Sequence, residues 1–124
     1  MKTAILAAAT LSLACLGTAE AAQKKVNVPN AYDGNWSIEV ITTAGTCDRA
    51  YRYGVRIANG EASYPGSDFT IAGRVAANGA VRATISRGST SANVVGRLGR
   101  EGFGNGTWKA DGGCSGNWNA ERRS

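Results

Sequence analysis

The chain has 124 residues, a formal net charge of +5 and 17 glycines. It contains no histidine, which excludes a Ser-His-Asp or Cys-His nucleophile site, a histidine zinc site and a histidine-ligated haem. Its one methionine is Met1, which falls in a segment that we expect to be removed. The acidic residues form no alternating run of the calcium-loop type, so we expect no metal site.

Residues 1–21 have the layout of a secretory signal peptide. Lys2 is followed by an apolar run over 4–17 and by the small-residue triplet Ala19-Glu20-Ala21. The run is shorter than the ~20 residues that cross a bilayer, and no second apolar segment follows it. A lipid anchor at Cys15 is disfavoured, because Ser12 stands where that motif has leucine. We therefore expect a periplasmic or secreted protein without a transmembrane segment, and removing 21 of 124 residues leaves 103.

Residues 22–31 are expected to form a flexible N-terminal lead. This stretch is polar, contains Lys24, Lys25 and Pro29, and shows no clear period. From Tyr32 onward apolar and polar residues alternate, and clusters of Gly, Asn, Asp and Ser interrupt them about every eight to twelve residues. This pattern predicts a single β domain over residues 32–124.

The alternation predicts short strands and no helix of useful length. It is clearest over 51–58, where Tyr51, Tyr53 and the next two odd-numbered residues share one face and Arg52 and Arg56 share the other. Asn59-Gly60 is typical of a tight hairpin turn. The predicted strands are 36–43, 51–58, 61–64, 69–75, 81–86, 90–98, 103–110 and 114–122.

Short connections between these strands predict antiparallel neighbours and therefore an up-and-down meander. Eight such strands can close on themselves, which removes both exposed sheet edges. A single layer has no other element to cover its apolar face, so the alternative is a β-sandwich. We predict an all-β fold, an eight-stranded antiparallel up-and-down barrel.

Two cysteines follow the predicted cleavage site, Cys47 and Cys114. An exported chain without a metal-ligating partner for them is expected to join them in a disulfide. In the chain-entropy model, a loop of this length would stabilise the fold by up to ~4 kcal/mol.

A Gly-x-Trp motif occurs three times, ending at Trp36, Trp108 and Trp118. In each copy the glycine and the tryptophan share one face of a strand. The favoured interpretation is that the three indoles fill the core, and the alternative is an aromatic floor on which a ligand stacks. Tyr51 and Tyr53 are expected to be core or rim aromatics and carry the same alternative. Small inward residues leave room for a ligand or for the tryptophans: Gly73, Ala83, Ala92, Gly96 and Gly104.

Several arginines fall on the polar side of the predicted strands. A basic surface of this kind favours anionic partners such as an envelope polymer, although arginines also decorate the solvent face of strands without binding anything. Nucleic acid is disfavoured, because Arg52 projects from the face opposite Tyr51 and Tyr53 and no stacking platform results. The candidate anion-binding face comprises Arg52, Arg56, Arg74, Arg82 and Arg97.

Two resemblances follow from these residues. Trp36 near the start of the first strand and Arg122 near the end of the last resemble the barrel-closing pair of the calycin proteins, the lipocalins and avidins, which implies a cation–π contact at a closed end. The stretch from Tyr32 to Arg122, with Cys47-Asp48-Arg49-Ala50-Tyr51-Arg52-Tyr53 in front and Cys114-Ser115-Gly116-Asn117-Trp118-Asn119-Ala120-Glu121-Arg122 behind, is similar to a group of small exported proteins from soil alphaproteobacteria. The second resemblance implies a compartment and no activity.

Together these features predict a non-enzymatic periplasmic or secreted binding module without a cofactor, whose ligand the sequence does not identify. A first alternative is a protein-interaction factor, such as a protease inhibitor or an envelope accessory protein, acting through loops at one rim. A second is binding to an anionic envelope polymer through the outward arginines.

Overall fold

The computed structural model describes residues 30–124, so the predicted signal peptide and residues 22–29 of the predicted lead lie outside the described residues. The described part folds into strands with no helix, and therefore with no helix that is long and apolar enough to cross a membrane. The strands are β1 (Gly34–Ala44), β2 (Ala50–Ala58), β3 (Glu61–Ser63), β4 (Thr70–Val75), β5 (Ala80–Arg87), β6 (Thr90–Leu98), β7 (Phe103–Ala110) and β8 (Ser115–Arg122).

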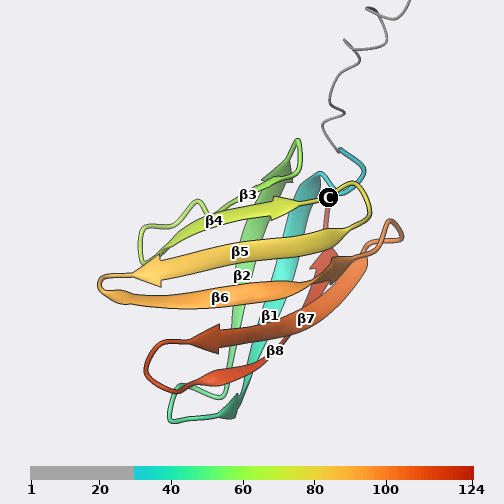
Figure 1. Cartoon of the computed structure of the whole chain (residues 1–124). Helices are drawn as coiled ribbons and strands as arrows, with labels where there is room; N and C mark the ends of the chain where they lie inside the picture. The colour runs from blue at the N-terminus through green and yellow to red at the C-terminus, as the bar shows by residue number, and fades with distance from the viewer. Residues whose placement is uncertain (1–29) are drawn as a thin grey trace, which may run out of the picture.

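Each strand pairs antiparallel with the next one along the chain, and β8 pairs with β1 to close a barrel (Figure 1). The closing ladder runs from Trp36 opposite Arg122 to Thr42 opposite Gly116, and a bulge follows before Ala44. The predicted up-and-down barrel is therefore confirmed, and the β-sandwich alternative is wrong because all eight strands join in one closed sheet.

The predicted strands differ from the observed ones at their ends. β1 begins two residues earlier than predicted, at Gly34, and β3 ends one residue earlier, at Ser63. β3 stops there because Pro65, two residues on, has no N–H to donate to a ladder. Ala31, assigned from the sequence to the lead, packs against the core, so the packed part of the chain begins before Tyr32.

Exposure of the inward side chains changes from one end of the barrel to the other. Along β2, Tyr51 and Tyr53 are partly exposed, whereas Val55 and Ile57 are buried. Along β6, Ala92 is partly exposed and Leu98 is buried. The barrel therefore has a closed end, where β1 begins and β8 ends, and an open end on the opposite side.

The closed end is held by the N-terminal segment and Arg122. The guanidinium carbon of Arg122 lies 5.0 Å from the ring centroid of Trp36, which is 1% exposed. Arg122 also donates to the backbone oxygens of Ala31 at 3.1 Å, Asp33 at 3.2 Å and Arg100 at 2.9 Å. The Trp36 indole N–H donates to Tyr32 O at 2.8 Å. Residues 31–33 and the end of β8 therefore seal this end together.

The open end carries the disulfide, and the shortest strand, β3, does not reach it. Cys47 in the β1–β2 loop and Cys114 before β8 are bonded, which confirms the predicted pair. β2 pairs with β3 only over residues 56–58, so residues 50–55 are bonded to β1 alone. The wall of the barrel is consequently weakest between β2 and β4 at the open end.

Candidate binding cavity

A cavity of about 370 Å³ lies inside the barrel and opens to solvent at the open end. Its lining comes from all eight strands, with Ala62 as the contribution of β3, because every strand turns one alternate set of residues inward. Ile38, Val40, Val55, Ile71 and Val94 are representative of this lining. Cavities that hold small molecules are typically ~300–1,000 Å³ and mostly apolar, so this one has the size and the chemistry of a small ligand site.

Two of the three tryptophans line the cavity, and their placement explains two of the three copies of the Gly-x-Trp motif. In the β7–β8 ladder Trp108 lies opposite Gly116, and Trp118 lies opposite Gly106. Each indole therefore covers the glycine of the other motif copy. The Trp118 N–H donates to Val95 O on β6 at 3.0 Å, so its ring spans β7 as well. The two indoles form one wall of the cavity.

The third tryptophan, Trp36, lies at the closed end and does not line the cavity. All three indoles are buried, at 1%, 9% and 4% exposure for Trp36, Trp108 and Trp118. The position of each tryptophan therefore bears on the two interpretations, core packing and ligand contact. Trp36 seals the barrel, while Trp108 and Trp118 present surface to its interior.

The small inward residues divide in the same way. A Cβ at Gly96 would meet the Trp118 ring, and one at Gly104 would meet the Leu98 side chain, so these glycines make room for large neighbours. Gly73, Ala83 and Ala92 instead line the cavity. The space inside the barrel therefore exists because small residues face it from β4, β5 and β6.

Aromatic side chains close the weak part of the wall. Tyr64 and Phe69, on either side of the β3–β4 loop, stack with centroids 3.9 Å apart, and Tyr53 on β2 meets Phe69 edge-on at 4.8 Å. This cluster joins β2 to the start of β4 where no backbone ladder does. Tyr51 lies beside Tyr53 with centroids 5.8 Å apart, and both tyrosines line the cavity mouth.

One cation at the mouth was not among the residues singled out from the sequence. Arg87 ends β5, and it belongs to the inward set of that strand together with Val81, Ala83 and Ile85. The alternation could have revealed it, since Arg87 continues the odd-numbered series. It was missed because the predicted strand ended at residue 86.

The phenol of Tyr53 has a raised pKa. Burial is the largest cause, and the Arg87 guanidinium beside it opposes the shift. The pKa of Tyr64 is raised as well, first by its hydrogen bond to Asp68, in which the hydroxyl donates at 2.9 Å. Both phenols are consequently neutral hydrogen-bond donors at physiological pH.

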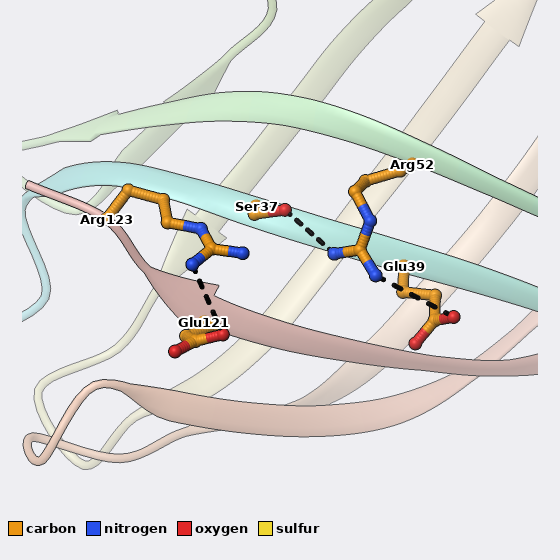
Figure 2. Close-up of polar contacts among 5 residues, drawn as sticks. All are labelled: Ser37, Glu39, Arg52, Glu121 and Arg123. Atoms are coloured by element: carbon orange, nitrogen blue, oxygen red, sulfur yellow. Dashed lines mark hydrogen bonds and ion pairs between the residues drawn. The ribbon is translucent and has the colours of Figure 1, made fainter.

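The five outward arginines do not form a single uncompensated surface. Arg52 on β2 contacts Ser37 at 3.0 Å and Glu39 at 3.8 Å on the neighbouring β1, as Figure 2 shows beside the pair of Arg123 and Glu121. Arg74 lies 3.5 Å from Glu61. Exposed pairs of this kind contribute little stability, but they reduce the net positive charge that a polymer would meet.

The remaining members of that set are distributed over three strands. Arg56 donates to Asn35 on β1 at 3.3 Å, and Arg97 donates to the backbone oxygen of Asn78 at 2.8 Å. Arg82 lies opposite Arg74 in the β4–β5 ladder. The structure therefore brings Arg74 and Arg82 together and leaves the other three in separate polar contacts.

Within residues 30–124, no three His, Cys, Asp or Glu side chains gather as a metal ion would require. The fold and the cavity define a class, the small disulfide-bonded up-and-down β-barrel with an apolar interior open at one end. Comparison with protein-family models, curated proteins and solved structures finds no match for this chain.

Proposed function

We propose that the mature protein is a non-enzymatic binding module that holds a small apolar or amphipathic molecule inside its barrel. The observation that carries this proposal is the cavity of about 370 Å³, lined by apolar side chains and two indoles. An apolar ligand is favoured because transfer of apolar surface from water into such a site contributes roughly 25 cal/mol per Å².

The arrangement of the barrel supports a pocket rather than incomplete packing. Its closed end is tightly sealed around Trp36 and Arg122, so the chain has enough large residues to fill a core where filling is needed. Next to this sealed layer, small residues such as Gly73 and Ala83 face the interior, and the large aromatics stand at the open rim. Space is therefore left inside the barrel, below the rim through which a ligand would enter.

Export fits the same proposal. Residues 1–21 have the layout of a signal peptide, and a disulfide persists in an oxidising compartment. We propose that the module acts in the periplasm or outside the cell.

A neutral fluorescent probe tests the cavity directly. N-phenyl-1-naphthylamine should bind the mature chain with enhanced emission, and Ala83→Phe should weaken binding by about tenfold, because the new ring occupies the cavity. The matched control is Ala72→Phe, which adds the same ring at an exposed position of β4 and should bind like the wild type.

Binding that is absent, or that Ala72→Phe and Ala83→Phe weaken equally, would contradict the proposal. Near-ultraviolet circular dichroism of both variants establishes that the barrel is intact. Native mass spectrometry of the protein purified from the periplasm without refolding would then identify a retained ligand by its mass.

A further inference from the structure

We infer that the ligand is an amphiphile with an ionised carboxylate, bound with its apolar part in the cavity and its carboxylate at Arg87. This inference rests on the proposed function and adds the chemical class of the ligand. Its basis is the combination of an apolar cavity with an inward-facing cation at the mouth.

The direction of Arg87 follows from its place in β5. Val81, Ala83 and Ile85 line the cavity, and Arg87 is the next residue of that inward series and lines the cavity mouth. Arg82, on the same strand, is exposed like Arg87 but belongs to the outward series and does not line the cavity. Arg87 therefore directs a positive charge at the entrance of an otherwise apolar space.

Within residues 30–124 no carboxylate lies within ion-pair distance of Arg87. The three ion pairs of this part of the chain use Arg52, Arg74 and Arg123. Arg74, which also contributes to the cavity lining, is paired with Glu61, and Arg122 at the closed end already donates to three backbone oxygens and covers an indole. Arg87 lies beside the Tyr53 phenol, which can engage only part of the five N–H donors of a guanidinium. It thus keeps donors available for an anion.

Neighbouring groups add donors suited to a carboxylate. Thr90 is the cross-strand partner of Arg87 and also lines the mouth, and the neutral Tyr53 hydroxyl lies beside the guanidinium. A planar guanidinium matches the two oxygens of a carboxylate through parallel hydrogen bonds. These groups together form a site for one carboxylate at the rim.

One acid also faces this region. Asp68 accepts the hydrogen bond of Tyr64 and raises the pKa of Tyr53 through its charge. Its negative charge would disfavour an anionic head near the β3–β4 loop. The carboxylate is therefore expected on the β5–β6 side of the mouth, at Arg87 and Thr90.

The test compares decanoate with decanol, which differ in the head group and share the apolar tail. Each displaces N-phenyl-1-naphthylamine from the mature chain at neutral pH and low salt. Decanoate should bind more tightly than decanol, and Arg87→Gln should weaken decanoate by about tenfold while leaving decanol within about twofold. Arg87→Lys keeps the charge but lacks the planar guanidinium, so its affinity for decanoate should lie between those of the wild type and Arg87→Gln. The matched control is Arg82→Gln, which removes the same charge from the outward face and should change neither affinity.

The outcomes separate this inference from the proposed function. If the neutral probe does not bind at all, the cavity function itself fails. If probe and decanol bind but Arg87→Gln leaves decanoate unchanged, the carboxylate site is wrong and the apolar cavity stands. Equal weakening by Arg82→Gln and Arg87→Gln would also overturn the inference, because the effect would then come from net charge rather than from a site.

Discussion

Arg122 shows how much one side chain can contribute to this barrel. It donates to backbone oxygens of three residues that lie before β1 or in the β6–β7 loop, and it covers the indole of Trp36. A backbone oxygen at a sealed end loses its water when the barrel closes, so it needs a donor from the protein. Arg122 supplies these donors to segments that are distant in the sequence.

We expect Arg122→Met to lower the free energy of unfolding by about 3 kcal/mol, because it removes hydrogen bonds from a charged donor and a cation–π contact. Urea denaturation followed by tryptophan fluorescence measures the change. Arg123→Met is the matched control, since it breaks only the exposed pair with Glu121 at 3.5 Å and should cost less than about 1 kcal/mol. Equal effects of the two variants would show that Arg122 does not hold the closed end.

At the scale of elements, the β7–β8 hairpin accounts for two of the three copies of the Gly-x-Trp motif. The antiparallel register sets each tryptophan against the glycine of the other copy, Trp108 opposite Gly116 and Trp118 opposite Gly106. A side chain at either glycine would occupy the space of an indole or of the neighbouring backbone. The hairpin therefore accommodates two indole rings side by side, because each ring lies over a glycine that has no side chain to obstruct it.

Gly106→Ala should destabilise the barrel by about 1–3 kcal/mol, because the added Cβ would lie 2.6 Å from the Trp118 indole nitrogen and would press on Val95 O. The Trp118 N–H bond to Val95 O would be disturbed as well. Thermal unfolding monitored by circular dichroism measures the loss. At Gly54, also within a strand, a Cβ would meet nothing within 4 Å, so Gly54→Ala should be neutral or slightly stabilising. A Gly106→Ala variant as stable as Gly54→Ala would refute this account of the motif.

For the whole molecule, the disulfide and the β1–β8 ladder link the same distant parts of the chain. Cys47 and Cys114 are 67 residues apart and join the β1–β2 loop to the segment before β8. The ladder between β1 and β8, which closes the barrel, begins next to this disulfide, where Ala44 lies opposite Ser115. The disulfide therefore keeps β1 and β8 near each other in the unfolded chain, which lowers the entropy of that chain and the entropic cost of pairing the two strands.

Reduction of the disulfide should lower the free energy of unfolding by about 4 kcal/mol in the chain-entropy model. Urea unfolding with and without dithiothreitol measures this difference, and the exposure of Cys47 allows the reductant to reach the bond. The double variant Cys47→Ala and Cys114→Ala should unfold like the reduced protein and should not respond to the reductant. A wild-type midpoint that reduction does not move would contradict the prediction.

Most of the fold follows from the alternation of residues, and less of the site does. Residues 51–57 predict both the strand and the inward direction of Tyr51 and Tyr53, since side chains alternate strictly along a strand. Arg87 was not predicted to face the cavity, because the alternating pattern does not fix where a strand ends and the predicted strand stopped at residue 86. The cavity could not be predicted, because Ala83 and Gly96 are alike in sequence terms, yet one faces open space and the other faces Trp118.

The amino-acid sequence by itself determined the number of strands, their order, the inward face of each and the pairing of the two cysteines, because these depend on local alternation, turn residues and cysteine count. Only the tertiary structure decided which end of the barrel is sealed, where the indoles leave room and that Arg87 stands at the mouth. Those features depend on the register between neighbouring strands and on closure between β1 and β8, which bring together side chains from distant parts of the chain.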